Sequence, residues 1–82
     1  MQITVKTFAQ TREVCEEPEL LLTLSPNASI ADAIALLKSR SAKWGLALES
    51  HVLTACNQQL CDQQTALSAG DELAIFPPVT GG

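Results

Sequence analysis

The stretch Ser29–Ser41, S-I-A-D-A-I-A-L-L-K-S-R-S, decides the fold class because its apolar residues recur at helical spacing. Ser29 is a favourable N-cap, and Asp32 three residues later forms an approximate capping box at the positive end of the helix dipole. One apolar stripe follows from the spacing: Ile30, Ala33, Ile34 and Leu37. The pattern predicts a helix with one buried face.

Short strand patterns flank this helix on both sides. Before it, Ile3 and Val5 alternate with polar residues, and Pro26 follows a second apolar run. The predicted strands cover residues 1–8, 20–24, 52–56, 60–61 and 72–76. Residues 57–59 and 68–71 are predicted turns, and residues 62–66 a polar loop. Residues 9–19 are predicted to form a loop, and residues 43–50 a partly buried connection over one end of the sheet.

The order of these elements defines the expected architecture. A single helix of this length cannot cover both faces of a sheet, so we expect two layers, with the other face partly solvated. The first and last strands are expected to be central, parallel neighbours. This arrangement is the α+β class with a β-grasp (ubiquitin-like) mixed sheet packed on one main helix. The predicted domain is 1–76, followed by a flexible C-terminal Gly-Gly tail at 77–82.

Composition restricts the function classes. The chain has 82 residues, enough for one domain, and 46% of them are hydrophobic, which suits a globular core. A net charge of −4 argues against nucleic-acid binding, and five Lys and Arg are too few for an anionic-membrane patch. No membrane span or signal peptide is apparent, so a cytoplasmic protein is expected. Cys15, Cys56 and Cys61 lack a CxxC spacing, so we expect reduced thiols and no metal site.

The two phenylalanines of the chain fall on an unexpected face. Strand alternation points Phe8 and Phe76 away from the core, although Leu73 and Ile75 point into it. Together with Leu60 and Ala74, the two rings are expected to form an apolar patch, and such patches usually mark a partner surface. The alternative is a bulge that reverses one strand end, or a loop that covers Phe8.

The C-terminal carboxylate is the candidate reactive group. His51 is the one histidine, it has no acid or cysteine partner in the sequence, and no phosphate-binding loop appears. A free α-carboxyl is ionised at neutral pH and can attack the α-phosphate of ATP held by another protein. Pro77-Pro78 favours an extended tail, and Gly81-Gly82 would pass through a narrow channel. The sequence therefore argues against a self-contained enzyme.

These motifs resemble a known family over essentially the whole chain. The stretch 70–82, G-D-E-L-A-I-F-P-P-V-T-G-G, strongly resembles the C-terminus of the small subunit of molybdopterin synthase, a ubiquitin-like sulfur carrier. The segments F-A-Q-T-R-E at 8–13, K-W-G-L-A-L-E at 43–49 and C-N-Q-Q-L at 56–60 are also similar to that family. The F-P-P-V-T-G-G ending is specific, whereas Gly-Gly alone is shared with other carriers and modifiers.

The resemblance implies a mechanism in which this chain binds no cofactor. An adenylating enzyme would use ATP to make an acyl adenylate at Gly82, and sulfur transfer would convert it to a thiocarboxylate. The tail would then enter the large synthase subunit and donate sulfur to cyclic pyranopterin monophosphate, forming the dithiolene of molybdopterin. Two small and two large subunits would make up the heterotetramer.

The resemblance also assigns residue roles. Phe8, Leu60 and Phe76 match the docking surface of the family, and Arg12 is a candidate for a polar contact beside it. The expected tail contacts are Pro77, Pro78, Val79, Thr80 and Gly81. Thr7 departs from the apolar residue expected on the inner face. The cysteines have no part in the family's chemistry.

Three alternatives remain open at this stage. The chain could carry sulfur for another pathway, such as thiamine synthesis or tRNA thiolation. It could be a protein modifier that is conjugated to lysines through Gly82. It could also be a plain binding domain with an idle tail. The first two share the adenylation step, so only Pro77-Pro78-Val79-Thr80 favours the synthase subunit.

Overall fold

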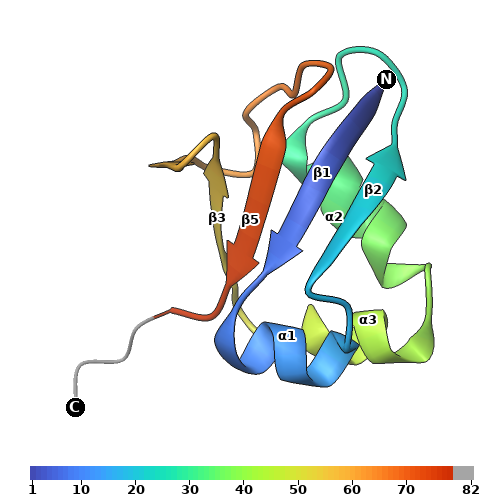
Figure 1. Ribbon diagram of the computed structural model, residues 1–82, viewed down its shortest axis with the longest axis vertical. Coiled ribbons are helices and arrows are strands. Elements are labelled where there is room, and N and C mark those ends of the chain that lie inside the picture. Colours follow the sequence, from blue (N-terminus) through green and yellow to red (C-terminus); the bar gives the residue numbers. More distant parts are fainter. Residues whose placement is uncertain (79–82) are drawn as a thin grey trace.

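The computed structural model describes residues 1–78 of the chain, and within them one mixed sheet packs against helices (Figure 1). The strands are β1 (Gln2–Thr7), β2 (Glu19–Thr23), β3 (Leu53–Cys56), β4 (Gln59–Leu60) and β5 (Glu72–Phe76). The helices are α1 (Ala9–Cys15), α2 (Ile30–Lys38) and α3 (Ala42–Ala47). The strand order is β2-β1-β5-β3-β4, with β1 parallel to β5 and the other neighbouring pairs antiparallel. The predicted central pair, β1 and β5, is confirmed.

Helix α2 lies behind the sheet in Figure 1 and supplies one side of the core. Its predicted capping box is present: Asp32 N donates to Ser29 Oγ over 3.2 Å, and Ser29 N donates to Asp32 Oδ2 over 2.9 Å. The predicted stripe is buried against the inner face of the strands. The helix ends at Lys38, three residues before the predicted end at Ser41, because Ser41 caps the next helix.

The prediction of a loop at residues 9–19 was wrong, because this segment contains a helix. The predicted connection at 43–50 is partly buried, as expected, but it is largely helical. Residues 9–19 contain α1, which buries Thr11 and Cys15 one turn apart. Its C-cap residue, Glu16, has a left-handed conformation with φ 63°. Residues 43–50 fall largely in α3, whose N-cap Ser41 accepts a hydrogen bond from Trp44 N over 3.1 Å. Trp44 is fully buried in the core, which explains why so short a helix is stable.

The alternation predicted for β1 and β5 is confirmed, including the inward position of Thr7. Ile3, Val5, Leu73 and Ile75 face the core, and Thr7 lies among them with 2% exposure. Thr7 Oγ1 donates to the Glu17 carbonyl oxygen over 2.7 Å, so the buried hydroxyl is satisfied. Strand β5 ends at Phe76, where the sequence places the end of the domain. Residues 79–82 of the predicted tail lie outside the described residues.

Candidate functional site

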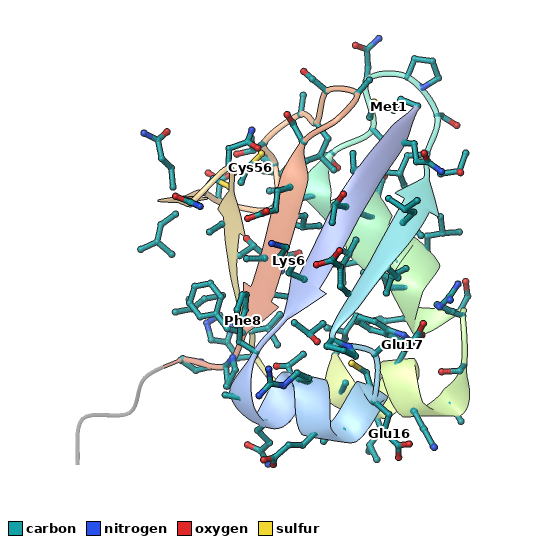
Figure 2. The ribbon with its side chains drawn as sticks, viewed as in Figure 1. Met1, Lys6, Phe8, Glu16, Glu17 and Cys56 are labelled. Atoms are coloured by element: carbon teal, nitrogen blue, oxygen red, sulfur yellow. The ribbon has the colours of Figure 1, made fainter. Side chains whose placement is uncertain are left out.

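The outer face of the sheet carries the patch that the two phenylalanines predict. Phe8 N donates to the Ile75 carbonyl oxygen over 3.2 Å, which extends the β1–β5 pairing by one residue. Phe8 therefore lies next to Phe76, and Leu53 pairs with Phe76 from β3. Figure 2 shows Phe8 at the end of the sheet where β5 finishes. The three side chains form a row across the last pairs of these strands.

A second apolar row lies beside the first. Ala74 pairs with Ala55, and Ala55 pairs with Leu60 on β4. We call the exposed and half-buried members of the two rows the outer apolar surface: Phe8, Leu53, Leu60, Ala74 and Phe76. Ala55 lies between them but is itself buried, with 8% exposure. Phe8 is 44% exposed and Leu60 is 72% exposed, so both are available to a partner. Neither a bulge nor a covering loop buries Phe8, and the alternative interpretation of its position is wrong.

A charged cluster limits this surface on the β1 side. Lys6 is opposite Ala74, and its Nζ lies 3.1 Å from Glu72 Oε1 and 3.9 Å from Glu19 Oε1. The hydrogen bond with Glu72 raises the pKa of the Lys6 ammonium. Figure 2 shows Lys6 at the middle of the sheet's exposed face. The outer apolar surface therefore has a polar rim, as protein interfaces do.

The other predicted site residues have different positions. Arg12 is exposed on α1. Its backbone N donates to the Phe8 carbonyl oxygen over 3.4 Å, so Arg12 lies one helical turn from Phe8 of the outer apolar surface. Pro77 and Pro78 follow β5 directly and are half-buried. The remaining predicted residues, Val79, Thr80, Gly81 and the reactive Gly82, lie outside the described residues. Partner contacts of all these residues stay predictions.

Leu53 is the member of the surface that sequence reasoning missed. It alternates with Ala55 in a strand that was predicted correctly, so the signal was present in the sequence. What the sequence lacked was the register, because only the pairing of Leu53 with Phe76 shows that β3 continues the patch.

A second missed feature is a hydrogen-bonded cluster around the Glu17 carboxylate. Arg40 Nε and Nη2 donate to the two carboxylate oxygens of Glu17 over 2.8 and 3.0 Å, and Trp44 Nε1 donates to Glu17 Oε1 over 2.7 Å. The Arg40 bonds, and then the Trp44 bond, lower the pKa of the Glu17 carboxyl to about 2. Because Glu17 also accepts from Thr7 through its backbone, this cluster holds the strand end that precedes Phe8.

The cysteines are free thiols, as expected. Cys15 is buried, and Cys56 and Cys61 are half-buried. Burial, followed by a hydrogen bond to Asp71, raises the pKa of the Cys56 thiol to about 11, so Cys56 stays protonated at neutral pH. His51 is exposed next to β3.

Residues 1–78 contain no group of three or more His, Cys, Asp and Glu side chains that could hold a metal ion. None of the helices in the same range has the length and apolarity to cross a membrane.

Fold and site together define a class: a β-grasp protein with an apolar outer face beside Pro77-Pro78, where a tail that ends in Gly-Gly begins. The chain belongs to the ThiS family, whose model matches residues 5–82. It is 42% identical to the molybdopterin synthase sulfur carrier subunit of Haemophilus influenzae and 39% identical to that of Escherichia coli. Each comparison covers 98% of this chain and 99% of the relative.

The chain is also similar to a protein whose name gives it another role. The chain is 32% identical to small archaeal modifier protein 1 of Haloferax volcanii, over 94% of this chain and 97% of the relative. The crystal structure of SAMP1 from the same organism superposes with a TM-score of 0.82 at 30% identity, covering 100% of both chains. This likeness confirms the predicted β-grasp fold.

Proposed function

We propose that the chain is the sulfur-carrier subunit of a molybdopterin synthase. The observation that carries this proposal is the full-length similarity to sulfur carrier subunits at 42% and 39% identity, in a chain that ends F-P-P-V-T-G-G. The geometry supports it, because the outer apolar surface adjoins the strand from which the tail departs. A carrier needs both features: a face that docks and an end that reacts.

The chemistry takes place at Gly82, in the active sites of other proteins. An activating enzyme binds ATP, and the Gly82 carboxylate attacks the α-phosphate, so that pyrophosphate leaves and an acyl adenylate forms. A sulfur nucleophile then displaces AMP, and the chain ends in a thiocarboxylate. This chain supplies the carboxylate and the docking face, while ATP belongs to the partner.

In the second half of the cycle the chain docks on the large subunit of the synthase. The sulfur of the Gly82 thiocarboxylate bonds to a carbon of cyclic pyranopterin monophosphate and displaces an oxygen substituent, so that a thioester joins the tail to the substrate. Water then hydrolyses this thioester, which leaves the sulfur on the substrate and regenerates the Gly82 carboxylate. Phe8, Leu60 and Phe76 would contact the large subunit, with Arg12 beside them as a polar contact. Residues 77–81 would line the path of the tail in the partner. Two small and two large subunits would form the assembly.

A protein modifier is the second candidate function, favoured by the similarity to the archaeal modifier protein. The two functions share the adenylate and diverge at the nucleophile, which is sulfur for a carrier and a lysine amine for a modifier. A sulfur carrier of another pathway would differ only in the acceptor of its sulfur.

Intact mass spectrometry tests the proposal. The chain is incubated with its activating enzyme, ATP and a sulfur donor, and then with the large subunit and cyclic pyranopterin monophosphate. We expect a mass gain equal to replacing one oxygen by sulfur, which disappears when the large subunit and substrate are added. Lysine conjugates in a cell extract, without that gain, would favour the modifier. A stable thiocarboxylate that the synthase does not consume would favour another pathway.

A further inference from the structure

The root of the tail has a second apolar side, away from the sheet. Pro77 lies beside Val14 of α1 and Leu46 of α3, and these residues line a hollow of about 50 Å³. Leu46 is 61% exposed, although it is a large aliphatic side chain, and Val14 and Pro77 are half-buried. Figure 1 shows α1 and α3 at the same end of the molecule at which β5 finishes. Apolar groups therefore border the root of the tail on two sides.

The chemistry of the hollow indicates what fits it. Its polar lining consists of Gln10, Thr11, Ser50 and His51. Among the described residues that line it, none is Asp, Glu, Lys or Arg, although these types make up 17% of the chain. The hollow has room for only a few water-sized groups. It suits the end of a small aliphatic side chain.

The length of the tail determines what covers this hollow. Four residues follow Pro78, and fully extended they span at most about 13–14 Å. A partner that acts on the Gly82 carboxylate must therefore bring its own surface against the root of the tail. The outer apolar surface meets that partner on the sheet side, and the hollow lies on the side of α1 and α3.

We propose that the hollow is a second docking point, in which the large subunit of the synthase seats a small aliphatic side chain between Val14, Leu46 and Pro77. This inference rests on the proposed function, because it is the capture of the tail that brings the partner to this side. Leu46 then contributes to affinity by leaving water on binding. The interface would surround the tail rather than lie on one face of it.

The test is a comparison of glutamine variants of two equally exposed leucines. Leu46→Gln keeps the size and helix propensity of the residue but removes its apolar end. Leu21→Gln is the matched control, because Leu21 is 63% exposed on β2, at the opposite edge of the sheet from β4. We expect Leu46→Gln to weaken binding of the full-length chain to the large subunit roughly tenfold, measured by calorimetry. Leu46→Met should restore the affinity, and Leu21→Gln should bind as the wild type does.

The outcomes separate this inference from the proposed function. If Leu46→Gln binds as tightly as Leu21→Gln while Phe76→Asp binds weakly, the partner docks on the sheet side alone and the inference is overturned. If Phe76→Asp and Leu46→Gln both bind normally, the proposed docking of the outer apolar surface on the large subunit fails together with the inference. Sedimentation provides a further check. If the wild-type chain is a dimer, and Leu46→Gln dissociates it without changing the affinity for the large subunit, the hollow is a contact between two copies of the chain. That result would overturn the inference.

Discussion

The indole Nε1 of Trp44 donates a 2.7 Å hydrogen bond to Glu17 Oε1, and this bond joins the core of α3 to the segment that leads into β2. Trp44 is fully buried, while the Glu17 side chain is 34% exposed. The buried indole N–H therefore has a carboxylate at the protein surface as its hydrogen-bond acceptor. Figure 2 shows Glu17 at the end of the molecule occupied by α1 and α3. The same residue holds Thr7 through its backbone and thereby supports the position of Phe8.

Glu17→Ala should destabilise the fold. The substitution leaves the Trp44 N–H buried without its partner, and an unsatisfied buried donor of this kind costs about 1–3 kcal/mol. For a domain of this size, the lower half of that range corresponds to a melting temperature about 4–16 °C lower. Thermal unfolding followed by circular dichroism measures it.

The neighbouring Glu16 provides the control. Its carboxylate lies 2.9 Å from Lys43 Nζ, but the two side chains are 61% and 59% exposed. Exposed pairs contribute little, so Glu16→Ala should change the free energy of unfolding by less than about 0.5 kcal/mol. Equal melting temperatures for the two variants would show that the Trp44–Glu17 bond does not stabilise the fold.

The Glu17 carboxylate should also make stability depend on pH at acidic values. Its pKa is lowered from 4.5 to about 2, so the charged form is favoured in the folded state. The stabilisation is fully present above about pH 4.5 and is lost as the pH falls through about 2. Because the side chain is partly exposed, solvent screening reduces the size of the effect.

Glu17→Gln isolates this contribution, because the amide oxygen can still accept from Trp44. We expect the difference in melting temperature between wild type and Glu17→Gln to be constant near neutral pH and to shrink below about pH 4.5. A difference that stays the same down to pH 2 would assign the effect to packing rather than to charge.

Phe8→Asp should separate binding from stability. Phe8 occupies the N-cap of α1 without a side-chain capping bond, and aspartate is a favoured N-cap residue. The variant should therefore be at least as stable as the wild type. It should bind the large subunit roughly 30-fold more weakly or worse, as expected when a central aromatic residue of an interface is lost.

Titration calorimetry and thermal melts on the same preparations check both parts. Phe76→Asp should weaken binding similarly, with a modest loss of stability because Phe76 is half-buried. Leu21→Asp, which changes an exposed leucine on β2, should do neither. A large fall in the melting temperature of Phe8→Asp with unchanged affinity would place Phe8 in the core rather than in the interface.

The parts of the fold that depend on local pattern could be predicted from the sequence. Strand β5 begins and ends as the alternation indicates, and the Ser29–Asp32 capping box marks the start of α2. Helix α1 gave no such signal, because only Thr11 and Cys15 are buried among its polar residues. Helix α3 is six residues long and contains Gly45, so its stability comes from the burial of Trp44 and not from helix propensity.

In the candidate site, too, the features that follow a local sequence pattern could be predicted, and those that depend on tertiary contacts could not. Phe8 and Phe76 were predicted to point outward from period-two alternation alone, and the parallel pairing then places them side by side. The Glu17 cluster could not be predicted, because its bonds join residues 23 and 27 positions apart. Contacts at such separations follow from tertiary packing, which no local pattern encodes.

Deleting Gly82 should abolish sulfur transfer and leave the fold intact. The buried residues of the described core all precede Phe76, so removal of the last residue takes nothing from it. The truncated chain should have an unchanged melting temperature and should still bind the large subunit through the outer apolar surface.

The truncated chain ends at Gly81, one residue short, so its carboxylate would stop about 3.5 Å before the position at which the activating enzyme reacts. An error of that size removes the near-attack geometry on which transfer depends. Intact mass after incubation with the activating enzyme, ATP and a sulfur donor should show no thiocarboxylate, whereas normal loading of the truncated chain would contradict Gly82 as the reacting residue.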